Sequence, residues 1–238
     1  MVNQELDYEI PWRPLTIAWL VASIVILAIA LGRGHIVVSI VFAAVVLLWV
    51  NFCSTVVHYA LDADEFNKWP IVGAAFVRFQ SHHFPKWINV IHQKPVLDLV
   101  GELNPFAIIN LVSPLLLFRM HSREVFVTWA SLMLVGGYAM ICHRWAHLPP
   151  RARPAFATAL QRARLALRPE VHWRHHALAV NPGPVFVPNF DLSFGWSNAV
   201  MNPVFRRLPS PRLWLIIMAA LILGQVPLLT LLLRWLER

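Results

Sequence analysis

Long apolar runs, separated by two polar stretches, dominate the pattern of residues along the chain. A membrane-spanning helix needs about 20 predominantly apolar residues, within a range of about 17–25. Four runs fall in that range, and a shorter fifth run is interrupted by Pro114. The four are Leu15–Leu31, Ile36–Tyr59, Val125–Cys142 and Leu213–Trp235, and the fifth is Phe106–Phe118. The pattern predicts an all-α integral membrane protein with four to five transmembrane helices, folded as one domain over residues 1–238.

The connections between these runs predict where the polar stretches lie. The short link Gly32–Gly34 joins the first two runs into an antiparallel hairpin, and Arg119–Glu124 forms the turn before Val125. The polar stretches are Asp62–Asn104 and His143–Arg212. With five spans, both stretches fall on the same side of the membrane and form one cap.

The distribution of basic residues predicts which side that is. Of the 20 Lys and Arg residues, five lie on the side opposite the polar stretches, which leaves fifteen on the side of the cap. Cytoplasmic loops carry the excess of Lys and Arg. The cap and the N-terminus are therefore expected in the cytoplasm, with the C-terminus outside. The five opposite residues are Arg33, Arg119, Arg123, Arg234 and Arg238.

Composition supports the membrane interpretation and narrows the partners. The chain is 58% hydrophobic and 13% charged, with a net charge of +8, whereas a soluble domain is usually about 25% charged. A basic surplus on a membrane protein favours contact with anionic headgroups. No basic face interleaved with aromatics forms a soluble module, so nucleic acid is not expected as a partner. Cys53 and Cys142 form no paired motif, which argues against a disulfide framework.

The segment Ala155–Leu167 has apolar residues at helical spacing opposite Arg162 and Arg164. Such a segment is typical of an amphipathic helix lying in the membrane interface. The alternative is an ordinary surface helix that packs on the cap. We expect the interfacial arrangement, because the neighbouring chain lies in the membrane.

Nine of the 11 histidines fall in the two polar stretches or at the helix ends that lead into them. Residues four apart share one face of a helix, so His58 pairs with Asp62 and His143 pairs with His147. His172, His175 and His176 fall within about one helical turn. His82 and His83 are adjacent, and His92 follows nine residues after His83. The exceptions, His35 and His121, are expected on the opposite side as capping or interfacial residues.

Clusters of this kind predict a metal centre, because neutral imidazole is the commonest metal ligand and suits iron, copper and zinc. Nine histidines and a carboxylate suffice for two ions. A zinc protease would carry His-Glu-x-x-His, yet the pair at His143 reads HRWAH without a glutamate. Haem in a membrane bundle would use single histidines facing each other across the spans. Sites with eight or more histidines match the integral-membrane di-iron oxygenases, so two iron ions are expected.

The motifs around these histidines resemble those of the Kua-type lipid desaturases. VHYALD (His58, Asp62) is similar to that family's VHWxAD, and PIVGAAFVRFQSHH (Pro70–His83) to its PIVGxAFIRxFxxHH. His92 follows at the family's spacing. CHRWAH, HWRHH and FGWSN are similar to the family's His-x-x-x-His, His-x-x-His-His and GWxN motifs. The resemblance covers roughly residues 51–208, and its most specific part is Pro70–His83.

Two departures from the family pattern concern ligands and substrate. The family carries a further histidine after His-x-x-His-His, where this chain has Asn181 nearest. The segment QKPVLDLVGELN after His92 is longer than the family's acidic stretch, and it contains Glu102. We treat Asp62, Asn181 and Glu102 as candidate odd ligands or groups that orient the imidazoles. His92 could likewise orient a ligating imidazole and not bind the metal itself.

The resemblance implies an oxidoreductase that uses O2 and two external electrons to desaturate a phospholipid chain. No reductase domain lies in the chain, so an electron donor similar to cytochrome b5 or ferredoxin is expected. The metal carries the chemistry and the protein positions the lipid. Helix-end histidines place the metals near the headgroup, so the double bond is expected within the first few carbons. Formation of a vinyl ether, as in a plasmalogen, is the leading expectation; an acyl double bond in an ester phospholipid is the other.

Two other functions stay open at this stage. A di-iron lipid hydroxylase would use a similar site, and nothing in the sequence separates its outcome from desaturation. A membrane protein that stores or transports metal would instead line its spans with polar residues at mid-depth, and the predicted spans are almost free of them.

Overall fold

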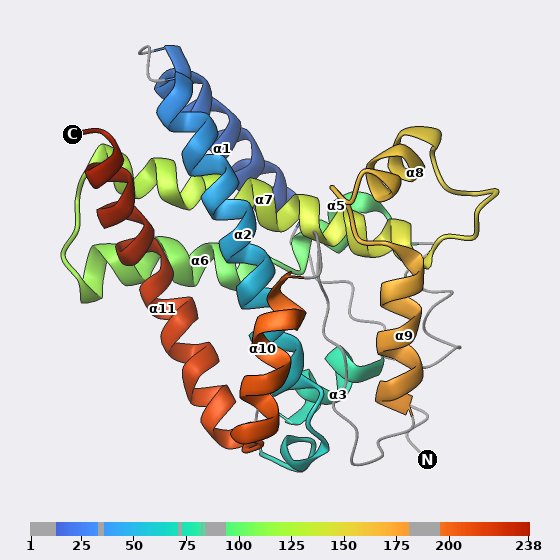
Figure 1. Cartoon of the computed structure of the whole chain (residues 1–238). Coiled ribbons are helices and arrows are strands. Elements are labelled where there is room, and N and C mark those ends of the chain that lie inside the picture. The colour runs from blue at the N-terminus through green and yellow to red at the C-terminus, as the bar shows by residue number, and fades with distance from the viewer. Residues whose placement is uncertain (1–12, 33–35, 71–72, 82, 84–93, 181–195) are drawn as a thin grey trace.

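A computed structural model describes residues 13–32, 36–70, 73–81, 83, 94–180 and 196–238 (Figure 1). Every regular element in this part of the chain is helical. The long helices are α1 (Arg13–Gly32), α2 (Ile36–Leu61), α7 (Arg123–His147) and α11 (Pro211–Leu236). The shorter ones are η1 (Asp64–Phe66), α3 (Gly73–Ser81), α5 (Val96–Gly101), α6 (Asn104–Val112), η2 (Ser113–Leu117), α8 (Ala155–Arg162), α9 (Pro169–Val180) and α10 (Trp196–Arg207).

Five helical segments are long and apolar enough to cross a membrane, in agreement with the predicted all-α membrane fold. The fifth differs from the sequence prediction in its bounds. Instead of Phe106–Phe118, it runs over Val96–Leu117, because α5, α6 and η2 follow one another with only a short break. Pro114 does not end it, since a five-residue π-helical turn accommodates the missing N–H. Glu102 thus belongs to this span rather than to a polar loop.

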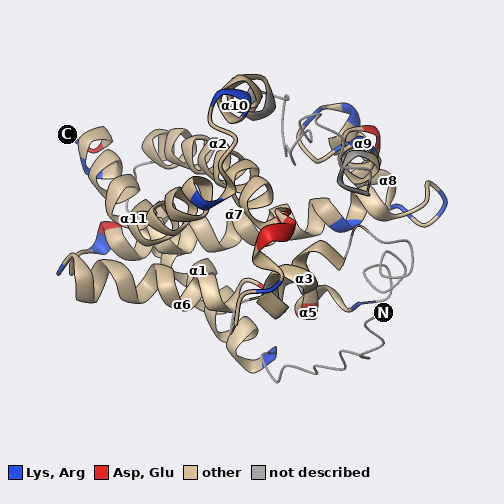
Figure 2. Cartoon of the chain, turned by 90° about the horizontal axis from the view of Figure 1, so that it is seen from below, with Lys and Arg blue, Asp and Glu red and all other residues tan. Residues whose placement is uncertain are grey.

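Helix α7 lies at the centre of the bundle and packs against α1, α2 and α11. Its buried side chains join those of the neighbouring helices in one apolar core that includes Phe42, Val125 and Leu229. The outer faces carry exposed apolar side chains, such as Val37 at 75% and Leu116 at 71% exposure. These faces suit lipid, and Figure 2 shows the charged residues mostly at helix ends and in the cap.

Polar side chains between the spans are paired with one another. Gln225 on α11 accepts a hydrogen bond from Trp49 Nε1 at 3.1 Å and donates one to Asn110 Oδ1 at 2.9 Å. Asn104 Oδ1 accepts from Trp19 Nε1 at 2.6 Å. Pairing of this kind removes much of the cost of polar groups in hydrocarbon. It also fixes the lateral register of α1, α2, α6 and α11.

The remaining helices form the cap at one end of the bundle. Helix α10 packs on α2, where the Ser197 and Thr55 hydroxyl oxygens lie 2.9 Å apart. Helix α9 packs on α7, and α3 on η1 and α2. Helix α8 is shorter than the predicted Ala155–Leu167, because the chain leaves helical geometry after Arg162 and turns through a left-handed residue, Arg164, with φ 61°.

The start of α3 depends on a close approach that only glycine permits. A Cβ atom at Gly73 would lie 2.5 Å from the backbone oxygen of Asn67. Substitution Gly73→Ala should therefore destabilise the fold by about 1–3 kcal/mol, as overpacking does. Gly224→Ala is the matched control, since nothing lies within 4 Å of a Cβ there. Thermal unfolding in detergent should show a lowered midpoint for the first variant alone; equal midpoints would contradict the packing at η1.

Candidate metal centre

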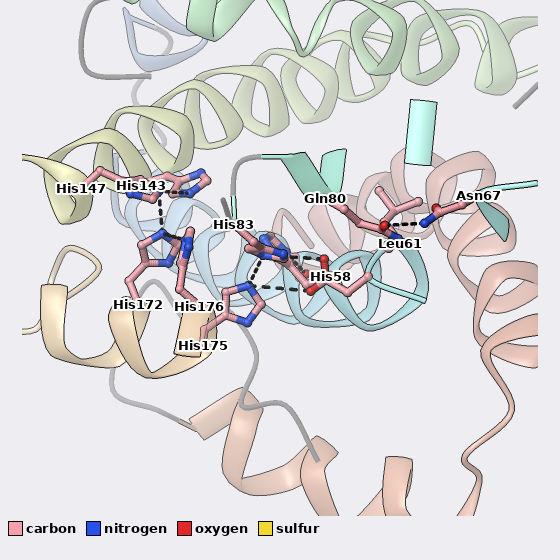
Figure 3. Close-up of polar contacts among 12 residues, drawn as sticks. His58, Leu61, Asn67, Gln80, His83, His143, His147, His172, His175 and His176 are labelled. Carbon is pink, nitrogen blue, oxygen red and sulfur yellow. Dashed lines mark hydrogen bonds and ion pairs between the residues drawn. The ribbon is translucent and has the colours of Figure 1, made fainter. Parts of the chain in front are cut away.

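Four helices bring their ends together in the cap, and each carries or precedes one of the histidine motifs (Figure 3). Helix α2 ends with His58 in its last turn, α7 ends at His147, and α9 contains the His-x-x-His-His motif. His83 lies directly after α3, where its backbone N–H donates to the Gln80 carbonyl at 3.0 Å. Segments far apart in the sequence are thus placed around one point.

The first set of ligand atoms, which we name the four-histidine group, consists of His143, His147, His172 and His176. Their candidate ligand atoms all lie within 4.8 Å of one another. Nε2 of His147 lies 3.0 Å from that of His143 and 2.7 Å from that of His172. Nε2 of His176 lies 2.9 Å from that of His172. Three of the four residues are buried and His143 is half-buried.

The second set, which we name the carboxylate group, consists of Asp62, His83 and His175. Nε2 of His83 lies 3.0 Å from Nε2 of His175. Oδ1 of Asp62 lies 3.8 Å from Nε2 of His83, and Oδ2 of Asp62 lies 3.7 Å from Nε2 of His175. Those separations are too long for hydrogen bonds. One ligand atom from each of the three side chains nevertheless lies within 4.8 Å of the others, and Figure 3 shows His83 and His175 facing each other.

The two groups adjoin. The ring centroids of His83 and His176 are 4.9 Å apart, and those of His172 and His175 are 5.9 Å apart. Helix α9 supplies both groups, because residues three and four apart point to neighbouring parts of one helical face. His172 and His176 belong to the four-histidine group, while His175 belongs to the carboxylate group. A single His-x-x-His-His motif therefore joins the two halves of the site.

His58 lies beside the carboxylate group. Its ring centroid is 5.4 Å from that of His175, and Phe79 packs edge-on against it at 5.1 Å. Nδ1 of His58 lies 2.8 Å from the Ser54 carbonyl oxygen, an arrangement in which Nδ1–H donates. This hydrogen bond selects the tautomer whose Nε2 lone pair can bind a metal, as metal-ligating histidines generally do.

A polar clamp that sequence reasoning missed holds α3 against the end of α2. Gln80 donates to the Leu61 carbonyl at 2.8 Å and accepts from Asn67 Nδ2 at 2.8 Å (Figure 3). Leu61 is the last residue of α2, so its carbonyl has no partner further along the helix. The clamp thereby sets His83 opposite Asp62. The only sequence signal was the position of two amides inside a segment rich in candidate ligands.

A second set of hydrogen bonds, also missed, orders the connection between α7 and α9. Arg153 donates to the carbonyls of Trp145 at 3.1 Å and Leu148 at 2.8 Å, which caps the end of α7 beside His147. Gln161 donates to the Leu167 carbonyl at 2.9 Å. Pro169 then begins α9 with a residue suited to the first helical position. Long-range contacts of this type leave no pattern in the sequence.

The electrostatics of the cap favour a bound cation. Burial raises the pKa of the Asp62 carboxyl well above its usual value, and the nearby Asp64 raises it further. Burial also lowers the pKa of His172 well below its usual value, with smaller contributions from the neighbouring histidines. His172 therefore stays neutral, which is the form that binds metal. A cation bound between these groups would supply the positive charge that compensates the ionised Asp62 carboxylate.

The donor set fits two metal ions. Imidazole nitrogens bind such ions at about 2.0–2.1 Å, so two nitrogens at right angles around one ion lie about 2.9 Å apart. The separations of 2.7–3.0 Å between Nε2 atoms agree with this arrangement. Nitrogen-rich sites with a carboxylate and no thiolate suit iron, copper or zinc rather than magnesium or calcium.

Of the other histidines and candidate ligands, the structure describes Glu102 and His121, and neither lies in the two groups. Glu102 lies outside both groups and pairs with Lys94, so the structure gives it no place beside the candidate ligands. His121 is exposed and precedes the first residue of α7. That end of the helix is about 36 Å from His147, given the rise per residue of an α-helix. The remaining residues, His35, His82, His92 and Asn181, lie outside the described part of the chain.

Comparison with known proteins places this arrangement in a family. The profile of the lipid desaturase domain matches residues 47–208, which include both ligand groups. The chain therefore belongs to the lipid desaturase family, which confirms the resemblance noted in its motifs. No solved structure matches it.

A curated relative from Mus musculus, plasmanylethanolamine desaturase 1, is 28% identical over 168 residues. The match covers 66% of this chain and 59% of the relative. The chain thus aligns with a little over half of that protein's length.

The two-group geometry predicts how substitutions change the metal content. We expect about one iron ion per group in the purified protein. His147→Ala should remove the ion of the four-histidine group, and His83→Ala that of the carboxylate group, so that each variant keeps about half of the wild-type iron. Elemental analysis measures this.

His121→Ala is the control, because this residue lies at the opposite end of α7. It should keep the full iron content. Zinc in place of iron in the wild type, or unchanged iron in both ligand variants, would contradict the assignment.

Proposed function

We propose that this protein is a membrane di-iron lipid desaturase that introduces a double bond near the headgroup end of a phospholipid chain. The observation that carries the proposal is the pair of adjoining ligand groups at the ends of two spans, α2 and α7. Membership of the lipid desaturase family supports the reaction type. The ligands are Asp62, His83, His143, His147, His172, His175 and His176, with His58 as an eighth. His82 and His92 are proposed to complete the set.

The chain's own residues would hold the metals, and the metals would supply the oxidative chemistry. Two irons bound here would activate O2, which no side chain can do alone. Removal of one hydrogen from each of two neighbouring carbons leaves the alkene; O2, two electrons and two protons are consumed, and two waters form. The electrons come from an external donor similar to cytochrome b5 or ferredoxin. The protein orients the imidazoles, as the hydrogen bond to the Ser54 carbonyl does for His58. The helices that carry the two ligand groups hold the metals at a fixed height.

The height of the site determines which carbons are within reach. His58 and Asp62 lie at the end of α2, and His143 and His147 in the last turns of α7. Both helices leave the hydrocarbon there, close to the headgroups. Carbons next to the glycerol linkage therefore lie closer to the metals than carbons at mid-chain do. We propose an ether lipid that becomes a vinyl ether as the leading substrate, in keeping with the name of the mouse relative.

We also propose that the site and the N-terminus face the cytoplasm, on the basis of the excess of Lys and Arg on that side. Position 155 is exposed at the start of α8 and position 121 at the other end of α7. In sealed inside-out vesicles, a membrane-impermeant maleimide should react with Ala155→Cys and not with His121→Cys. The reverse pattern would place the site on the outer face.

The substrate proposal predicts a specific product. Membranes containing the active protein and supplied with an alkyl ether phospholipid should accumulate a lipid that releases a long-chain aldehyde in acid, because vinyl ethers hydrolyse and isolated alkenes do not. Mass spectrometry should show a loss of two hydrogens. His172→Ala should abolish the product, since this buried residue contacts His147 and His176.

His121→Ala is the matched control and should form product normally. A lipid that has gained one oxygen would instead indicate a hydroxylase. A new double bond at mid-chain would contradict the argument from depth.

A further inference from the structure

The helix α8 and the turn that follows it, Ala163–Arg168, form a basic and apolar surface beside the bundle that the metal chemistry does not use. Residues 148–180 contain six arginines and one acidic residue, Glu170. Arg153 caps α7, while the others are exposed: Arg151, Arg162, Arg164, Arg168 and Arg174. Figure 2 shows basic residues gathered in this part of the cap. We name the exposed face of residues 155–168 the arginine surface.

Large apolar side chains stand among these arginines. Phe156 is 60% exposed and Leu165 is 45% exposed. The opposite face of α8 is occupied, because Ala157 and Gln161 are buried. A segment that buries one face and exposes aromatic, aliphatic and arginine side chains on the other, as α8 and its following turn do together, is typical of the headgroup region.

The turn is held against the side of α7, within the length of that apolar helix. Tyr138 on α7 donates a hydrogen bond from its hydroxyl to the Leu165 carbonyl at 2.6 Å. Tyr138 lies nine residues before the end of α7 at His147, which is about 13 Å along the helix. Ala166 and Leu167 pack against Ala139, Cys142 and Ala146 of the same helix. The arginine surface thus lies alongside a membrane-spanning helix and not beyond its end.

A charged residue closes α8 where glycine would be easier. Arg164 has φ 61°, and the Leu165 N–H donates to the Leu160 carbonyl at 2.9 Å. Helices that end in this way usually place glycine at the left-handed position. The arginine adopts that conformation at a steric cost, and its side chain is exposed.

From these observations we propose that the arginine surface binds the anionic headgroups of the bilayer in which the protein sits. The depth and the exposed Phe156 and Leu165 favour lipid over an acidic soluble protein, for which apolar side chains at this depth would be inaccessible. This inference is independent of the proposed reaction. It gives α8 the role of an anchor at one side of the cap.

The test uses the full-length protein with a fluorophore attached at Ala159→Cys, an exposed position on α8, in nanodiscs of phosphatidylcholine with increasing phosphatidylglycerol. Each arginine near an anionic surface contributes about fivefold to binding. Quenching by lipids with a nitroxide below the headgroup should rise with phosphatidylglycerol. In the triple variant Arg162→Gln, Arg164→Gln, Arg168→Gln, the rise of quenching with phosphatidylglycerol should be lost, because the three contributions multiply to about a hundredfold. High salt should weaken the response of the unsubstituted protein.

Two control variants separate charge from folding. The triple replacement by lysine should keep the response, and Arg119→Gln with Arg238→Gln, at the other end of the spans, should not change it. Quenching that is independent of phosphatidylglycerol, or equal in the glutamine variant, would overturn the proposal. A label that responds to added poly-glutamate but not to phosphatidylglycerol would do so as well, and would indicate an acidic protein partner.

Discussion

Ligand side chains that face one another in a buried space constrain the whole structure. Four histidines in one group, and two histidines with a carboxylate in the other, place their candidate ligand atoms within 4.8 Å of one another. A metal ion held by each group would be coordinated by lone pairs that already converge on one point. The remaining architecture serves to hold the helices that bring these atoms together.

The transmembrane helices fix the height of the site, and the cap fixes its geometry. Helices α2 and α7 contact each other along the bundle and present His58 and His147 at the same end. The Gln80 clamp then sets α3 against the end of α2, and Arg153 caps the end of α7 on which α9 packs. His58 and His147 lie in the last turns of two spans, so the proposed site is at the boundary of the hydrocarbon. This height is the physical basis for the proposed reaction close to the headgroup.

The sequence was sufficient for the features that follow from periodicity and length. Four spans and both His-x-x-x-His-type pairs, His58 with Asp62 and His143 with His147, follow from hydropathy and the helical repeat. The fifth span was predicted too short, because Asp98 and Glu102 made α5 resemble a polar loop. The predicted helix at Ala155–Leu167 ends early at Arg162. The assignment of His175 to one group and of His172 and His176 to the other depends on how α9 packs, as do the roles of Gln80, Gln161 and Tyr138. Such long-range contacts have no local signature.

The most direct test of the account is the location of the metals. Crystals of the purified protein, measured at wavelengths on either side of the iron absorption edge, report the position of each iron independently of activity. The account predicts two anomalous peaks, one at about 2.0–2.2 Å from the Nε2 atoms of the four-histidine group and one at a similar distance from Asp62, His83 and His175. A single peak, a signal only at the zinc edge, or peaks away from these side chains would contradict it.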